Sequence, residues 1–257
     1  MDFSTLSLLA LASLFAGFVD AVVGGGGLIQ IPALFSVLPG ESPATLFGTN
    51  KTSSVFGTAS AAMHYARRVR IPWGATLPAA LAAFLFSYLG AAAVAWLPRE
   101  LLRPLILALL VGAAGYTFLR KDFGALHRPT HSGAREFGFA LLLGCVIGFY
   151  DGFFGPGTGS FLIFLFIRYF GFDFLHASAA AKVVNVATNL AALAYFIPHG
   201  NLLLQAALVM AVFNVAGAQA GSRLALRHGS GFVRVVFLGV VSLLILRFAW
   251  DSYGGGH

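Results

Sequence analysis

Long apolar runs alternate with short polar stretches along the whole chain, and this pattern predicts the fold class. The runs cover 3–40, 42–66, 71–98, 104–119, 137–167, 175–197, 202–222 and 235–250, with a polar stretch from Arg120 to Glu136 between the fourth and the fifth. A helix that crosses a bilayer needs about 20 mainly apolar residues. We therefore expect an all-α polytopic membrane protein.

The third run, 71–98, has the features of a complete membrane span. It contains no charged side chain, and Trp73 and Trp96 lie near its two ends. The distance between these positions is ~35 Å along a helix, about the thickness of one hydrocarbon core. Tryptophan is enriched at both membrane interfaces, so we expect the two side chains to mark the ends of this span.

The second half of the chain repeats the order of features in the first half. When the two halves are aligned without a gap so that Asp20 falls on Asp151, Lys51 falls on Lys182. The other matches join Gly17 to Gly148, Phe18 to Phe149, Gly24 to Gly155, Gly26 to Gly157, Leu34-Phe35 to Leu165-Phe166, Gly90 to Gly221 and Arg103 to Arg234. The chain has three lysines, and two of them occupy equivalent positions inside apolar runs. Such two-fold repeats are typical of transporter folds.

This repeat predicts the organisation of the chain. We expect a first transmembrane repeat over 1–119, a basic linker over 120–136 and a second transmembrane repeat over 137–257. The first segment of each repeat, 3–40 or 137–170, is too long for one straight helix and is interrupted by glycine. Each segment could be a re-entrant hairpin that returns to its starting side, or a single broken crossing. Hairpins, each followed by about three transmembrane helices, would make the two repeats inverted; broken crossings would make them parallel.

The distribution of basic residues favours the inverted arrangement. There, one side holds eleven of them: Arg67, Arg68, Arg70, Arg120, Lys121, Arg128, Arg135, Arg168, Arg223, Arg227 and Arg234. The other side holds Arg99, Arg103 and, near the end of the last helix, Arg247. In the parallel arrangement the same loops split seven against six, leaving Arg247 aside. Because cytoplasmic loops carry an excess of Lys and Arg, we predict inverted-topology repeats, a cytoplasmic linker and both termini on the non-cytoplasmic side.

Composition excludes several classes of protein. Charged residues make up 10% of the chain and the mean hydropathy is +0.85, whereas a soluble domain carries about 25% charged residues. A soluble enzyme, a disordered chain and a nucleic-acid-binding protein are therefore not expected, although the formal net charge is +7. The single cysteine, Cys145, excludes a disulfide framework and a cysteine-based metal site.

The glycine-rich breaks and the two lysines inside apolar runs predict an anion site. Each break would end one half-helix and start another, and a half-helix N-terminus offers free N–H groups and partial positive charge. Lysine inside a membrane span is costly and marks a functional candidate. We expect the two breaks to meet near the midplane of the membrane, where transporters bind substrate. The predicted substrate contacts are Lys51, Lys182, Asn50, Asn185, Asn189, Gly24, Gly25, Gly26, Gly155, Gly157 and Thr158.

Alternative roles remain open for several of these residues. Asp20 and Asp151 could form structural ion pairs with Lys51 and Lys182 that hold each hairpin to its neighbouring helix, or one of them could carry a proton. The asparagines could act as small polar contacts between helices. The histidines show no metal-ligand spacing, and no catalytic set of Ser, His and Asp is present, so we expect no catalytic residues, no metal and no cofactor.

The residues around the two breaks resemble a known family. The segment from Gly17 to Leu28, followed by Ile31-Pro32-Ala33-Leu34, resembles the first repeat of the TauE/SafE sulfite exporter family, and the segment from Gly148 to Gly159 resembles its second repeat, most closely in the YfcA-like branch. Thr49-Asn50-Lys51 and the stretch from Ala181-Lys182 through Asn185 and Asn189 are similar to the family's signatures as well. The resemblance spans nearly the whole chain and implies transport, often export, of sulfite or of organic sulfur anions such as sulfoacetate.

Together these observations predict a secondary transporter of the inner (plasma) membrane. The expected partners are a small anionic substrate and the lipid bilayer, with a homodimer as a possible assembly, and transport is expected to be coupled to protons. An anion channel, or a transporter of a different small carboxylate or oxyanion, is the alternative. An intramembrane enzyme would need a nucleophile or a metal set that the sequence lacks.

The predicted orientation can be tested with a reporter fused to the C-terminus. The charge distribution predicts that a reporter active only outside the cytoplasm is active in this fusion, and that a reporter active only in the cytoplasm is silent. A fusion in the linker at 120–136 should give the opposite pair of results. A cytoplasmic C-terminus would rule out the inverted arrangement.

Overall fold

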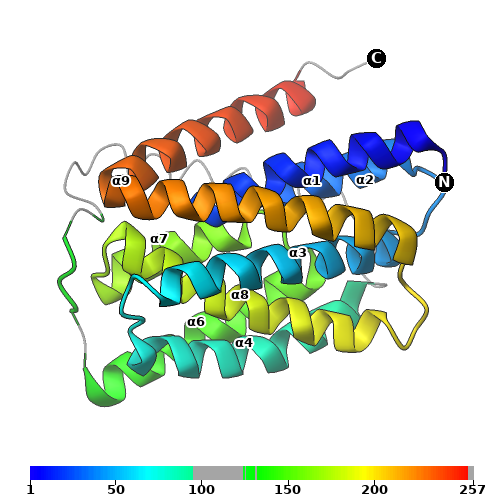
Figure 1. Cartoon of the computed structure of the whole chain (residues 1–257). Helices are drawn as coiled ribbons and strands as arrows, with labels where there is room; N and C mark the ends of the chain where they lie inside the picture. The colour runs from blue at the N-terminus through cyan, green and yellow to red at the C-terminus, as the bar shows by residue number, and fades with distance from the viewer. Residues whose placement is uncertain (95–123, 125, 131, 254–257) are drawn as a thin grey trace.

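The computed structural model describes residues 1–94, 124, 126–130 and 132–253, and the elements in them are α-helices. They are α1 (Phe3–Val23), α2 (Gly27–Val37), α3 (Pro43–Ala66), α4 (Trp73–Ala93), α6 (Gly133–Phe153), α7 (Thr158–Phe170), α8 (Phe174–Phe196) and α9 (Leu204–Tyr253). The helices pack side by side with their axes roughly along one direction (Figure 1). No strand occurs in the described residues, so the predicted all-α fold class is confirmed.

Among the described helices, five are long and apolar enough to cross a membrane, namely α1, α4, α6, α8 and the part of α9 from Leu204 to Val240. The helix α3 has 24 residues but is not among them. Its middle carries the polar run Thr49 to Ser53, which is buried inside the protein. Its polar side chains therefore face the interior of the bundle and not the outer surface. The predicted span at 104–119, Trp96 and the boundaries near residue 120 lie outside the described residues.

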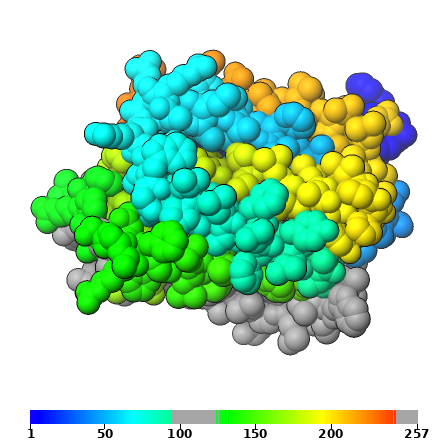
Figure 2. Space-filling view, turned by 90° about the horizontal axis from the view of Figure 1, so that it is seen from below, coloured from blue at the N-terminus to red at the C-terminus, as the bar shows by residue number. Residues whose placement is uncertain are grey.

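The outer surface of the helix bundle is apolar. Leucine and phenylalanine side chains of α4 and α6 are exposed, among them Leu81, Leu85, Leu89, Leu142 and Phe137. These two helices lie next to each other on one face of the molecule (Figure 2). A soluble protein rarely exposes so many large apolar side chains on neighbouring helices, and the bilayer accounts for their exposure.

The predicted glycine breaks occur in both halves, and they touch each other. The helix α1 ends at Gly24, which has a φ of +79°, and the chain between α6 and α7 contains Gly155 and Gly157 with φ of +90° and +80°. The Ser160 amide donates to the Gly24 carbonyl oxygen at 3.1 Å, and its hydroxyl donates to the Val23 carbonyl oxygen at 2.8 Å. The two breaks are therefore joined by direct hydrogen bonds.

The helices of the two halves exchange partners. The helix α1 of the first half packs against α9 of the second half, and α6 of the second half packs against α4 of the first half. A Cβ atom on Gly17 would lie 2.2 Å from the backbone oxygen of Asn214, and one on Gly148 would lie 2.5 Å from the Cα atom of Ala83. The alignment of the two halves pairs Gly17 with Gly148 and Ala83 with Asn214, so it converts the first contact into the second. The repeat seen in the sequence thus corresponds to a repeat of tertiary contacts.

Equivalent helices of the two halves run in opposite directions. The helix α3 and its counterpart α8 lie against each other, and Gly48 near the start of α3 lies beside Phe196 at the end of α8. Figure 1 shows the same opposition for α1 and α6. No membrane accompanies the chain in this structure, so the orientation of the halves relative to a bilayer stays a prediction.

The helix α9 contains a sharp bend. Gly229 has a φ of +76° and a ψ of −172° inside the helix, which divides it into two helical segments. After this bend the chain turns back along the bundle (Figure 1). The bend falls in the gap between the two apolar runs that the sequence predicts, 202–222 and 235–250.

The contact between the two breaks predicts a strong effect of a single methyl group. A Cβ atom on Gly159 would lie 2.4 Å from the Cα atom of Gly24, and backbone cannot move aside cheaply. We expect Gly159→Ala to destabilise the protein by about 3 kcal/mol, the upper range for overpacking, and to lower its thermal unfolding midpoint in detergent. Gly138→Ala in α6 is the matched control, because its Cβ atom would meet nothing within 4 Å. Equal midpoints for the two variants would contradict this packing.

Candidate functional site

The first buried ion pair joins α3 to α6. Lys51 Nζ lies 2.7 Å from Asp151 Oδ2, and the two side chains are 4% and 3% exposed. The position of Lys51 is set by the start of α3, where Ser42 is the N-cap, its hydroxyl accepts from the Thr45 amide at 3.1 Å, and Pro43 occupies the first helical position. A capped start with proline is a stable helix N-terminus, and it places Lys51 about two turns inside the helix.

The second ion pair joins α8 to α1. Lys182 Nζ lies 3.2 Å from Asp20 Oδ2, and it also donates to the backbone oxygen of Asp20. The Lys182 side chain is completely buried, whereas that of Asp20 is 14% exposed. The Thr58 hydroxyl donates to the same carboxylate at 3.2 Å. Asp20 lies in the last turn of α1. The ammonium group of Lys182 therefore also offsets the partial negative charge of the carbonyl oxygens at the C-terminus of α1.

Both pairs link one half of the chain to the other. Lys51 and Asp20 belong to the first half, and their partners Asp151 and Lys182 belong to the second. The hypothesis that each pair lies within one half, between a hairpin and its neighbouring helix, is therefore wrong. The partners are instead exchanged between the halves, and the alignment of the two halves converts one pair into the other. The ion pairs thus hold the two halves together.

A small cavity lies between the two glycine breaks. It has a volume of about 20 Å³, which is room for about one water molecule. Its walls come from α1, α2, α3, α6, α7, α8 and the breaks between them: Asp20, Gly24, Gly27, Asn50, Lys51, Ser54, Thr58, Asp151, Gly155, Gly159, Asn185 and Asn189. Residues from far apart in the sequence thus converge on one buried polar space.

Eight of the residues singled out from the sequence line this cavity. They are Asp20, Gly24, Asn50, Lys51, Asp151, Gly155, Asn185 and Asn189. The Lys51 ammonium group packs close to the first residues of the second break, since a Cβ atom on Gly155 would lie 3.0 Å from Nζ. A glycine is needed at this position both for its positive φ and for this close approach.

The other predicted contacts lie outside the cavity wall and shape its surroundings. Lys182 caps the end of α1. The Thr158 hydroxyl donates to the Gly155 carbonyl oxygen at 2.7 Å and closes the turn before α7, and Gly157 is the N-cap of that helix. Gly25 and Gly26 form the turn between α1 and α2, where a Cβ atom on Gly26 would lie 2.8 Å from the Asp20 Cβ atom. Whether any of these residues binds substrate stays a prediction.

Four residues of the wall are absent from the sequence-based set: Gly27, Ser54, Thr58 and Gly159. Ser54 and Thr58 follow Asn50 one helical turn after another on α3, and such residues share one face of a helix. The helical period from Asn50 could therefore have identified them. Gly27 and Gly159 belong to the glycine clusters, but their exact place at the wall depends on how the two breaks meet.

Some polar side chains at the cavity wall have hydrogen-bond partners in the described part of the protein, and others have polar atoms without one there. Asn189 Nδ2 donates to Asn185 Oδ1 at 3.1 Å. Asn50 is 4% exposed, and its Oδ1 atom has no hydrogen-bond partner among the described residues. Buried polar atoms are nearly always paired, so Asn50 marks a place where a water molecule or a ligand completes the site.

Several backbone amides at the starts of α2 and α7 already donate hydrogen bonds within the protein. At α7 the Ser160 amide donates to Gly24, and at α2 the amides of Leu28, Ile29 and Gln30 donate to the carbonyl oxygens of Gly25 and Gly26. The sequence predicts that these half-helix starts offer free amides to an anion. In this structure the breaks use several of these donors themselves, so fewer backbone amides are free than the sequence predicts.

In the described part of the chain, one group of possible metal ligands lies away from this cavity. The ligand atoms of His127, Asp173 and His176 lie within 4.8 Å of one another. The Asp173 carboxylate accepts from the His176 amide and contacts its ring, which caps α8, and the two imidazole rings stack with centroids 4.0 Å apart. Partial burial and the neighbouring His176 lower the pKa of His127, against the opposite influence of Asp173. The spacing along the sequence does not reveal this group, because only folding brings His127 to the other two.

Comparison with known proteins shows which family the sequence resembles over nearly its whole length. The family described as "Sulfite exporter TauE/SafE" matches residues 9–248. A Sinorhizobium protein named "Probable membrane transporter protein ORF9" is 37% identical over 98% of this chain and 95% of its own length. Escherichia coli "Probable membrane transporter protein YfcA" is 34% identical over 97% of this chain and 91% of its own length. A Haemophilus influenzae "Probable membrane transporter protein" is 31% identical over 96% of this chain and 95% of its own length. No solved structure shows a significant match.

These similarities, with five candidate membrane spans in the described helices, define a multi-pass membrane transporter. The chain belongs to the TauE/SafE sulfite exporter family, as the match covers nearly all of its length. The resemblance inferred from the two glycine breaks is confirmed.

The Lys51–Asp151 pair predicts a characteristic pattern of stability. Asp151→Leu or Lys51→Met alone leaves one unpaired buried charge, and we expect each to cost about 3–5 kcal/mol. The double variant should recover most of this loss, because apolar side chains of similar volume replace a buried pair at little or no cost. Thermal unfolding midpoints in detergent measure the four members of this cycle, and Arg70→Met is an exposed control expected to change stability by less than about 0.5 kcal/mol. If the loss of stability in the double variant equals the sum of the losses in the two single variants, Lys51 and Asp151 do not stabilise the protein through their interaction.

Proposed function

We propose that this protein is a secondary transporter, most simply an exporter, of a small sulfur-containing anion such as sulfite or an organosulfonate. The observation that carries the proposal is a buried lysine, Lys51, which faces a polar cavity between two glycine breaks together with Asn50, Asn185 and Asn189. An ammonium group and amide N–H groups are donors that suit a compact oxyanion. The family's description as sulfite exporters supports the sulfur chemistry.

In this proposal the two halves are inverted repeats of one transporter unit, and the site lies near the membrane midplane. The exchange of helix partners between the halves and the opposed directions of α3 and α8 support this arrangement. Transporters with such repeats move substrate by shifting one unit relative to the other around a central site. The hydrogen bonds of Ser160 and the two ion pairs are the contacts that such a shift changes.

The size of the cavity favours a transporter over an open channel. A space for about one water molecule is too small for a sulfur atom with three oxygens. An anion therefore enters only when the halves move apart or an ion pair separates. A step of this kind limits the rate and makes transport saturable, whereas a channel conducts through a continuous open path.

The ion pair provides the physical basis for the proposed coupling to protons. The substrate and the Asp151 carboxylate compete for the same ammonium group of Lys51. When the anion displaces the carboxylate, an unpaired buried charge remains, and this is strongly unfavourable. Uptake of one proton together with a singly charged anion keeps the net charge of the site unchanged. Anion binding is thus accompanied by proton uptake, and binding becomes tighter as the pH falls.

The proposal predicts which ligands stabilise the protein and how pH acts on them. Sulfite, thiosulfate, sulfoacetate, taurine and a small carboxylate are screened by thermal shift on purified protein. A ligand at about 100 times its Kd stabilises the folded state by about 2.7 kcal/mol, and we expect a sulfur oxyanion to do so, more strongly at pH 6 than at pH 8. Asp151→Asn removes the carboxylate that competes with the anion, so this variant should bind with less dependence on pH than the wild-type protein, measured with sulfoacetate, whose charge is constant between pH 6 and pH 8.

The matched control is the double variant Lys51→Met with Asp151→Leu, which keeps the fold but removes the charges. We expect it to lose the ligand-induced shift and substrate flux in proteoliposomes. If the double variant still binds and transports a sulfur anion, the site is elsewhere. If only the carboxylate gives a shift, the substrate class is wrong, and flux that fails to saturate would indicate a channel.

A further inference from the structure

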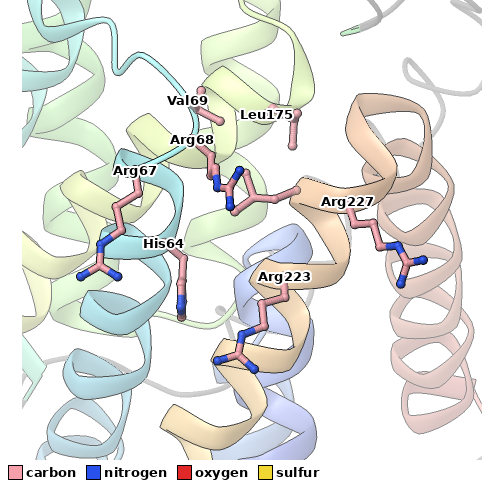
Figure 3. Close-up of a pocket in the computed structure, with 8 residues that line it drawn as sticks. His64, Arg67, Arg68, Val69, Leu175, Arg223 and Arg227 are labelled. Atoms are coloured by element: carbon pink, nitrogen blue, oxygen red, sulfur yellow. The ribbon is translucent and has the colours of Figure 1, made fainter.

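A second, larger hollow opens at one end of the bundle. It lies between the end of α3, the start of α8 and the part of α9 before Gly229, and its volume is about 680 Å³. It is lined by His64, Arg67, Arg68, Val69, Leu175, Arg223, Leu226 and Arg227 (Figure 3). None of these residues belongs to the wall of the central cavity. The hollow is therefore a separate feature of the molecule.

The hollow is strongly basic. Arg67 and Arg68 follow the end of α3, and Arg223 and Arg227 lie one turn apart on α9. All four side chains are exposed, no acidic residue lines the hollow, and no ion pair to any of the four occurs within the described part of the chain. Figure 3 shows Arg68 directed into the space between α3 and α9. Of the four arginines, Arg68 and Arg223 point into this space, and Arg67 and Arg227 lie at its two edges (Figure 3). Guanidinium groups in such an open space favour a ligand with negative charge and several oxygen atoms.

Apolar side chains form the rest of the wall. Val69 is buried, and Leu175 and Leu226 are half-buried. The hollow also lies where helices end: α3 ends at Ala66, and the exposed Trp73 begins α4 a few residues later. Tryptophan and arginine at helix ends are typical of the headgroup region of a membrane. A ligand with an anionic oxygen-rich head and an apolar part fits such a wall better than a free inorganic ion.

We propose that this hollow binds the headgroup of an anionic phospholipid. Arg68 and Arg223 hold the phosphate through bidentate hydrogen bonds, Arg67 and Arg227 add positive charge at the edges of the hollow, and the valine and leucine side chains contact the first carbons of the acyl chains. Basic pockets between membrane helices on the cytoplasmic side are suited to such headgroups. The bound lipid connects α3 to α9, two helices that come from different halves of the chain, and so stabilises the protein from its surface.

The test compares lipids in thermal unfolding of the full-length protein in detergent. Phosphatidylglycerol should raise the unfolding midpoint of the wild-type protein by several degrees more than phosphatidylcholine at the same concentration. The double variant Arg68→Gln with Arg223→Gln should lose at least half of this difference. The matched control, Arg70→Gln with Arg128→Gln, removes the same charge from exposed arginines outside the hollow and should keep it.

Each other outcome overturns the proposal. Equal stabilisation of the wild-type protein by the two lipids would mean that the hollow does not recognise the anionic headgroup. An equal loss in both double variants would mean that the effect comes from the overall surface charge. If millimolar inorganic phosphate, used without lipid, reproduces the full shift in the wild-type protein, the ligand is a soluble anion and not a lipid.

Discussion

Two buried ion pairs that cross between the halves are the constraint on which this structure depends. Burying a charge is unfavourable unless a partner of opposite sign lies close with good geometry. Lys51 Nζ and Asp151 Oδ2 lie 2.7 Å apart, and they stay so only while the two halves remain in contact. The polar residues of α3, the close approach of the two breaks and the small residues at the helix contacts all follow from the need to bring these groups together.

The glycines at the breaks make that approach possible. Because Gly24 and Gly159 lie backbone against backbone, the chain turns of both halves meet without side chains between them. The Ser160 hydrogen bonds then fix the register of one break on the other. The ammonium group of Lys51 lies directly beside Gly155 as a result. The position of the Lys51 ammonium group thus depends on how the two breaks meet. A substitution at Gly24, Gly159 or Ser160 should therefore also shift the ion pair.

Much of this arrangement could be predicted from the sequence. The apolar runs locate the helices, and the matching Lys and Asp residues reveal the repeat. The exchange of ion-pair partners could not be predicted, because a pairing within one half and a pairing between halves have the same sequence signature. The predicted cavity wall is incomplete for a related reason: Ser54 and Thr58 are recognisable on one face of α3, whereas Gly159 becomes a wall residue only through its contact with Gly24. The basic hollow is visible in the sequence only as an excess of arginine on one predicted side, since its shape depends on how α3 and α9 pack.

The two lysines are equivalent in sequence but not in their surroundings, and this difference bears on function. Lys182 is fully buried and donates to the carboxylate and to the backbone oxygen of Asp20, so its donors are directed to the end of α1. Lys51 has Asp151 as its ion-pair partner and faces the cavity beside Asn50, whose side-chain oxygen is unpaired within the described structure. In the proposed function, the anion reaches Lys51 by displacing one carboxylate, whereas at Lys182 it would also have to break the cap of a helix. The two pairs, which the alignment of the halves converts into each other, therefore differ in how firmly the ammonium group is held: one is bound to a carboxylate, the other to a carboxylate and to a helix end.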